Sequence, residues 1–267
     1  AAPQAPFVPR FKLTIEYAGT RYSGWQIQKN ARTVQGEIDL AARSVTGRRD
    51  FELYGSGRTD AGVHASGQVA HLDVSTKLPA DTLVQRLNDE LPADIHIRSA
   101  VIVPHRFHAR HDALRRRYVY QIATRRTAFA KPYVWWVKEP LDLARMRQLA
   151  GGFVGQHDFG AFAVERDDDE RSSVVRLERL ALIEAGGLIL VVVEGSHFLW
   201  RMVRRLVGVL VAVGRGDLRV DQAAALLNAR SEIPARLTAP ASGLFLARVF
   251  YKGDADEETV EPITPVH

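Results

Sequence analysis

The first hundred residues contain a fixed order of hydrophobic patterns, and this order constrains the fold more than any other feature of the chain. The stretch from Arg10 to Tyr17 alternates apolar and polar residues, as a half-buried strand does. Thr33 can cap a helix whose apolar residues recur at helical spacing. Strand, strand, helix and strand patterns then follow at Phe51–Tyr54, Gln68–Val74, Ala80–Leu91 and Ile95–Val103. The order β-α-β-β-α-β predicts the ferredoxin-like, or RRM-like, split unit.

The second half of the chain repeats this theme loosely. Its expected elements, in chain order, are the strand Arg117–Ala123, the helix Leu143–Val154, the strands Val174–Glu184 and Leu188–Glu194, the helices Leu199–Val213 and Val220–Ala229, and the strand Leu244–Tyr251. We therefore expect an α+β protein with two RRM-like halves, 10–110 and 111–252, whose sheets pack side by side around a basic central cleft. The tails 1–9 and 253–267 and the acidic insert 165–170 are expected to be loose.

Clustered arginines favour a polyanionic partner. The chain has 36 Lys and Arg against 31 Asp and Glu. The clusters are Arg48–Arg49, Arg115–Arg117, Arg125–Arg126, and Arg201 with Arg204 and Arg205. A planar guanidinium donates two hydrogen bonds at once, which suits phosphate. Each cluster alone could be a solvated face with acidic partners nearby, but together they favour a phosphate-rich partner, and we expect the cluster at 115–117 to bind it.

The composition also excludes several classes of protein and site. The chain has no cysteine, so disulfides, cysteine–zinc sites and thiol nucleophiles are excluded. The first residues lack the basic start and apolar run of a signal peptide. The longest apolar stretch, near 206–213, is far shorter than the roughly 20 residues of a membrane span. We therefore expect a soluble, cytoplasmic protein that does not enter a membrane.

One carboxylate, Asp60, lies on a glycine-framed turn between two expected strands. It belongs to the run Gly57-Arg58-Thr59-Asp60-Ala61-Gly62-Val63-His64. Glycine permits positive φ and close approach of a ligand to the main chain, and loops held on strands often carry catalytic side chains. A plain β-turn with an Asx hydrogen bond would also need only the Asp and Gly. The turn alone therefore leaves a structural and a catalytic interpretation open.

Six sequence blocks follow one another between Phe11 and Tyr251. They are Tyr17-x-Gly19-Thr20-x-Tyr22-x-Gly24-Trp25-Gln26-x-Gln28 with Thr33-Val34-Gln35; Gly57 to Ala65; Phe107-His108-Ala109-Arg110 leading to Arg116-Arg117-Tyr118-x-Tyr120; His157-Asp158-Phe159; Phe198-x-x-x-Met202-Val203-Arg204; and Ser242-Gly243-Leu244-Phe245-Leu246. In this order and spacing, the blocks resemble those of the tRNA pseudouridine synthase A family.

The resemblance implies roles for five residues. Asp60 falls at the position of the family's catalytic aspartate, and Arg58 resembles the loop arginine that displaces the target base. Tyr118 matches the tyrosine that stacks on the target uracil and is a candidate for handling the C5 proton. Arg204 matches the arginine that pairs with the catalytic carboxylate, which agrees with its place at the edge of the apolar stripe on a helical wheel. Leu244 matches an apolar residue of the uracil pocket.

The resemblance also implies the substrate and the assembly. Each family member folds as two RRM-like halves with a basic cleft, and the protein usually works as a homodimer. Bacterial members typically modify positions 38, 39 and 40 of the tRNA anticodon stem-loop. The reaction is an isomerisation, so it needs no cofactor, no metal and no second substrate. One carboxylate can attack C1′ or remove the C2′ proton, and the sequence leaves both routes open.

The target uridine must leave its stack to be isomerised, which requires an aromatic stacker and a side chain that fills the gap. Tyr118 and Arg58 fit these two tasks. A non-catalytic RRM-like RNA-binding protein is the alternative, but it would not need Asp60 on a glycine-framed loop. The spacing of His105, His108 and His111 suits neither face of a strand, so we expect no metal site there.

Overall fold

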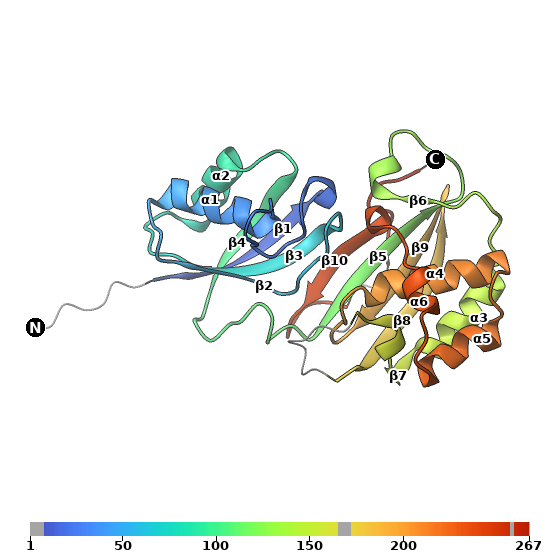
Figure 1. Cartoon of the computed structure of the whole chain (residues 1–267). Helices are drawn as coiled ribbons and strands as arrows, with labels where there is room; N and C mark the ends of the chain where they lie inside the picture. Colours follow the sequence, from blue (N-terminus) through green and yellow to red (C-terminus); the bar gives the residue numbers. More distant parts are fainter. Residues whose placement is uncertain (1–7, 165–171, 257–258, 267) are drawn as a thin grey trace, which may run out of the picture. The chain divides into compact units, whose positions relative to one another are not determined.

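The computed structural model describes residues 8–164, 172–256 and 259–266. Within them the chain forms two compact units. Unit 1 contains the described residues of 1–114 together with 246–252, and unit 2 contains those of 115–245 together with 253–267. Both units combine antiparallel strands with helices, so the α+β class is confirmed (Figure 1). The segments 1–7 and 165–170, expected to be loose, lie outside the described residues.

Unit 1 is built on the predicted β-α-β-β-α-β order. Its elements are β1 (Arg10–Tyr17), η1 (Gly19–Arg21), α1 (Val34–Thr46), β2 (Glu52–Gly55), β3 (His64–Asp73), α2 (Ala80–Glu90) and β4 (Ile95–Val103). Strand β1 lies between β4 and β3, β2 pairs with β3, and all three pairings are antiparallel. This is the strand order of the split unit. Figure 1 shows α1 and α2 over one face of this sheet.

The alternation in β1 decides which side of the sheet is covered. Phe11, Leu13 and Ile15 are fully buried, and burying each of these side chains stabilises the fold by about 1.5–3 kcal/mol. Helix α1 begins where the sequence predicts, because the Thr33 side chain accepts a hydrogen bond from the Gly36 N–H at 3.2 Å. It ends at Gly47, whose φ of 66° is the left-handed conformation of a helix C-terminus.

Unit 2 contains the longest helix of the described residues, α4, and most of the short elements. Its elements are β5 (Arg115–Ala123), η2 (Lys131–Tyr133), β6 (Trp135–Trp136), α3 (Leu143–Phe153), β7 (Gly155–Asp158), η3 (Gly160–Phe162), β8 (Val174–Ala185), β9 (Leu188–Gly195), α4 (Met202–Arg215), α5 (Val220–Ala224), η4 (Ala225–Asn228), α6 (Ile233–Arg236) and η5 (Ala241–Gly243). Strand β10 (Leu244–Phe250) begins in unit 2, and its residues from Leu246 belong to unit 1.

The sheet of unit 2 follows the order β5-β9-β8-β7, with antiparallel neighbours. Strand β6 pairs in parallel with the end of β5. Every residue of β9 is buried, as its unbroken run Leu-Ile-Leu-Val-Val-Val requires. No helix among the described residues combines the length and the apolarity needed to cross a membrane.

Several predicted boundaries are wrong by a few residues. Strand β3 begins at His64 instead of Gln68, and α4 begins at Met202 instead of Leu199, since Arg201 adopts a left-handed φ of 62°. The helix expected at 220–229 is α5 followed by the 3₁₀ turn η4. Strands β6 and β7 and helix α6 were not expected, because segments of two to four residues are too short to display a period.

The C-terminal segment also differs from the expected loose tail. The side chain of Gln121 donates to the Thr264 hydroxyl at 2.7 Å and accepts from the backbone N–H of Ile263 at 2.8 Å. Val266 is buried. Residues 263–266 are therefore packed into unit 2, with Ile263 and Thr264 bonded to β5.

Helix α4 packs closely on the segment that follows α6. The N–H of Ala239 donates to the Arg204 carbonyl at 3.0 Å. A Cβ placed on Gly208 would stand only 1.6 Å from the Leu237 carbonyl oxygen. Only glycine fits this contact, because both partners are backbone atoms.

Gly208→Ala should lower the free energy of unfolding by about 1–3 kcal/mol or more, because an extra methyl group in a closed contact forces backbone movement. Gly152→Ala is the matched control, since nothing lies within 4 Å of a Cβ at that exposed helical position. It should leave stability unchanged or raise it by up to about 1 kcal/mol. Urea unfolding of both variants measures the difference, and equal effects would contradict the close packing.

Candidate active site in unit 1

The loop that carries Asp60 is held by a buried glutamine of β3. Gln68 of β3 is fully buried, and its side chain donates to the Gly57 carbonyl at 3.0 Å. Its Oε1 accepts from the Ser56 hydroxyl at 2.8 Å. The Ser56 N–H also donates to the Val69 carbonyl at 2.7 Å. Hydrogen bonds therefore hold Ser56 and Gly57, the two residues between β2 and Arg58.

A second segment, residues 18–26, lies directly against this loop. The Trp25 N–H donates to the Thr59 carbonyl at 3.1 Å, and the Gly62 N–H donates to the Tyr22 carbonyl at 3.2 Å. Gly24 has a φ of 88°, and a Cβ there would stand 2.4 Å from the Thr59 carbonyl oxygen. Position 24 therefore requires glycine for both its conformation and its contact.

Side chains complete the attachment of the two segments. The Tyr17 and Thr59 hydroxyls are 2.8 Å apart. His64 is fully buried, and its Nδ1 accepts from the Gly19 N–H at 2.9 Å. His64 therefore supports the loop.

Asp60 lies at the outer end of this arrangement. Its side chain is half-buried, and Arg58 beside it is exposed, whereas Thr59 between them is buried. The Asp60 carbonyl accepts from the Val63 N–H at 3.1 Å, which closes the turn. Asp60 is thus partly exposed on a backbone that is bonded on both sides.

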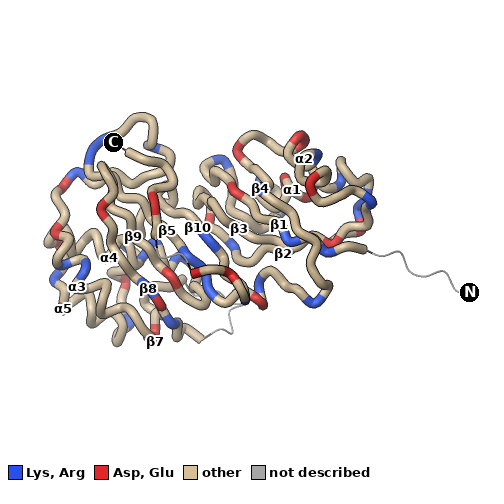
Figure 2. Tube along the Cα trace, turned by 180° about the vertical axis from the view of Figure 1, so that it is seen from behind, with Lys and Arg blue, Asp and Glu red and all other residues tan. Residues whose placement is uncertain are grey.

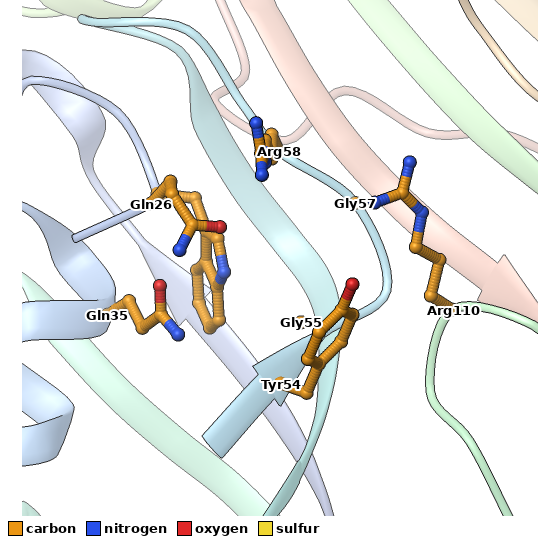
Figure 3. Close-up of a pocket in the computed structure, with 8 residues that line it drawn as sticks. Gln26, Gln35, Tyr54, Gly55, Gly57, Arg58 and Arg110 are labelled. Atoms are coloured by element: carbon orange, nitrogen blue, oxygen red, sulfur yellow. The ribbon is translucent and has the colours of Figure 1, made fainter. Parts of the chain in front are cut away.

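A small hollow of about 40 Å³ adjoins the loop. Its polar side chains include Gln26, Tyr54, Arg58 and Arg110 (Figure 3). Trp25 is buried along its wall, against Gly55, where a Cβ would stand 2.5 Å from the indole nitrogen. Two guanidinium groups and a phenol at one hollow are suited to bind phosphate and the polar edge of a nucleotide.

Two histidines hold Tyr54 and Arg110 at this hollow. Tyr54 stacks on His71 with ring centroids 5.8 Å apart and meets His108 edge-on at 4.8 Å. The Nδ1 of His71 accepts from the Ala109 N–H, and the Nδ1 of His108 accepts from the Arg110 N–H, each at 3.1 Å. Both rings therefore position the chain around Arg110.

These bonds require a nitrogen without a proton at each acceptor position. Burial lowers the pKa of His71 to about 4, with a smaller contribution from Arg10. Burial and the neighbouring His111 also lower the pKa of His108. Among the described residues, no three His, Cys, Asp or Glu side chains are placed to hold a metal ion.

The remaining expected site residues belong to unit 2. Tyr118 is half-buried on β5, and its ring meets Phe198 edge-on at 5.0 Å. Arg204 is half-buried on α4, and its Nε donates to the Ala239 carbonyl at 2.8 Å. Leu244 is buried at the start of β10.

The arginine cluster at 115–117 has a structural task that the sequence did not predict. Arg117 is buried, and its Nε lies 2.7 Å from a carboxylate oxygen of buried Glu194. Arg115 and Arg179 approach the same carboxylate at 3.5 Å. Arg117 therefore balances an internal carboxylate, whereas Arg115 also lies 2.5 Å from a carboxylate oxygen of exposed Asp256. Phosphate binding by the cluster 115–117 stays a prediction.

Sequence reasoning also missed the part played by Tyr54 and Arg110. Arg110 belongs to the Phe107–Arg110 block, which did mark it. Tyr54 carries no signal beyond its place at the end of a strand before Gly55. The hollow forms only because β2, the 18–26 segment and the 107–111 segment meet, and no local pattern encodes that meeting.

Comparison with known proteins places the chain in a family. The model of the family described as tRNA pseudouridine synthase matches residues 13–112 and 149–252. The chain belongs to the tRNA pseudouridine synthase family. Asp60, Arg58, Arg204 and Leu244 lie within the matched segments, whereas Tyr118 lies between them.

Relatives named tRNA pseudouridine synthase A match this family member over almost its full length. The one from Rhodopseudomonas palustris is 42% identical, covering 92% of this chain and 100% of the relative. Those from Nitrobacter winogradskyi and Halalkalibacterium halodurans are 41% and 39% identical, covering 92% and 90% of this chain and 97% and 91% of the relatives.

Gly24→Ala should lower kcat on an unmodified tRNA transcript by about 10- to 100-fold, because it displaces the loop of Asp60, the expected catalytic carboxylate, and small misplacements of such a group are costly. Gly47→Ala has the same positive-φ strain but nothing within 4 Å of its Cβ. It should cost about 1–2 kcal/mol of stability and leave kcat unchanged. Equal kcat in the two variants would show that the contact at Gly24 does not position Asp60.

Proposed function

We propose that this chain isomerises uridine to pseudouridine in tRNA, at positions 38–40 of the anticodon stem-loop, with Asp60 as the catalytic carboxylate. The observation that carries the proposal is the partly exposed Asp60 on a loop bonded to both Gln68 and the 18–26 segment. Family membership supports the same conclusion. A carboxylate fixed in this way can meet one reacting atom without rearrangement of its backbone.

The reaction breaks the N1–C1′ bond of uridine and forms a C5–C1′ bond. N1 ends with a proton, and C5 loses one, so no oxidant, reductant or second substrate is consumed. Asp60 can attack C1′ to give a glycosyl ester, or remove the C2′ proton to give a glycal. Either route uses the carboxylate in its ionised form and needs one face of the ribose at Asp60.

Arg58 is proposed to fill the gap that the displaced uridine leaves. It is exposed, lies two positions before Asp60 and lines the hollow with Arg110 and Tyr54. An exposed cation next to the carboxylate can enter a base stack without loss of buried contacts. Removal of the target nucleotide from its stack costs a few kcal/mol, which such a side chain helps to offset.

The unit 2 residues are proposed to bind the displaced base. Tyr118, braced edge-on by Phe198, is the aromatic stacker and a candidate to handle the C5 proton. Leu244 provides an apolar wall. Arg204 is proposed to pair with Asp60, and the bond from its Nε to the Ala239 carbonyl limits its motion. An arginine partner would favour the ionised form of the carboxylate.

We further propose that the protein acts in the cytoplasm as a homodimer, with RNA in a basic cleft between its RRM-like halves. Lysine and arginine residues occur throughout both units (Figure 2), which suits a long phosphate backbone. A non-catalytic RNA-binding role is not supported, since this chain matches nearly the whole length of relatives that are named as enzymes.

Asp60→Asn should reduce turnover by at least about 10²–10⁴-fold, the usual contribution of a base or nucleophile, with tRNA binding kept. The assay is tritium release from tRNA labelled at uridine C5, with no cofactor added. Asp89→Asn, an exposed carboxylate on α2, is the matched control and should release tritium at the wild-type rate.

A transcript with cytidine at positions 38, 39 and 40 tests the proposed sites and should release no tritium. Release at the wild-type rate by Asp60→Asn would refute the role of Asp60. Absence of release by the wild type, despite tight tRNA binding, would refute tRNA isomerisation.

A further inference from the structure

The segment that follows β5 and extends through β6 carries positive charge without any acidic residue. Residues 125–138, which we call the basic-aromatic loop, contain the cations Arg125, Arg126, Lys131 and Lys138 and no Asp or Glu. The loop lies in the part of the chain between the two segments that match the family model. None of the proposed site residues belongs to residues 125–138, so the charge of this loop is not part of the proposed catalytic site.

Two aromatic side chains of this loop face solvent. Phe129 is 97% exposed and Trp136 is 41% exposed. The Arg126 guanidinium lies 6.0 Å from the centre of the Trp136 ring. Large aromatic groups beside cations bind nucleic acid well, because bases stack on the rings while the cations meet phosphates.

The loop is held in place by buried polar contacts. Gln121 of β5 is fully buried, and its side-chain amide donates to the Tyr133 carbonyl at 3.0 Å as well as to Thr264. The Val137 N–H donates to the Ala123 carbonyl at 3.1 Å. The exposed aromatics therefore sit on an ordered backbone, which lowers the entropy lost on binding. Figure 1 shows this loop next to the C-terminal end of the chain.

We propose that the basic-aromatic loop is a second RNA-binding surface, which contacts tRNA nucleotides outside the anticodon stem-loop. This inference rests on the proposed tRNA substrate. From Tyr118 to Ala123, β5 extends about 17 Å at the usual rise per residue, and the loop begins beyond that end. A nucleotide bound at the loop is thus well separated from one stacked on Tyr118.

Charge favours RNA over a second copy of the chain as the occupant. A two-fold contact would bring the same cations of both copies together, and the loop offers no carboxylate to balance them. The phosphates of tRNA supply that balance. Unpaired bases of tRNA loops can stack on Phe129 and Trp136, as single-stranded bases do on exposed aromatic side chains.

The test is the triple variant Arg126→Ala/Phe129→Ala/Lys131→Ala, titrated with full-length tRNA and with the isolated anticodon stem-loop over a range of KCl concentrations. We expect Kd for full-length tRNA to rise at least about tenfold, because a stacking contact and two phosphate contacts are lost. The slope of log K against log salt should fall by about 1.5. Kd for the stem-loop and kcat at saturating tRNA should stay at wild-type values.

Arg86→Ala, on the exposed face of α2, removes one charge elsewhere and should leave the Kd ratio of the two RNAs unchanged. Unchanged binding of full-length tRNA by the triple variant would overturn the proposal. Equal weakening toward both RNAs would also overturn it, since the loop would then bind the stem-loop itself. So would a shift from dimer to monomer in sedimentation with RNA affinity retained.

Tritium release by the wild type tests the proposed isomerisation separately. Loss of affinity in the triple variant, with no isomerisation by the wild type, would refute the proposed function but would still support the proposed RNA-binding surface.

Discussion

The structure of the candidate site depends on one close approach between two backbone segments. Gly24 lies where any side chain would collide with the Thr59 carbonyl, and the next residue, Trp25, donates its N–H to that same carbonyl. Glycine and tryptophan thus act together: one permits the approach, and the other anchors it through a buried indole. Because the Asp60 turn is bonded from this side and from Gln68, it needs no ligand to take its shape.

Burial separates the charges that stabilise the fold from the charges that can bind a ligand. Glu194 is buried, and a buried carboxylate is tolerated only with cationic partners. Arg117, with Arg115 and Arg179 nearby, provides them. By contrast, Arg58 and the cations of the basic-aromatic loop are exposed. Burial, rather than the number of arginines in a cluster, therefore determines which arginines are available to bind RNA.

Local patterns predicted most of unit 1, because β1, α1 and α2 each have one buried face that repeats with the period of their element. The start of β3 was missed, since His64 and the residues after it belong to a glycine-rich block that reads as a loop. The charge of Arg117 could not be assigned from sequence, because its partner Glu194 lies far along the chain on β9. The hollow at Tyr54 and Arg110 was missed for the same reason. Asp60 could be proposed from the sequence because its block is short, continuous and self-contained.

Amide hydrogen exchange in the RNA-free protein tests the central claim most directly. If the Asp60 loop is already fixed before RNA binds, the N–H groups of Ser56, Trp25 and Val63 should exchange nearly as slowly as those of β3. Exchange at the rate of an open loop, with protection gained only on addition of tRNA, would contradict it. The site would then be formed by the substrate rather than by the fold.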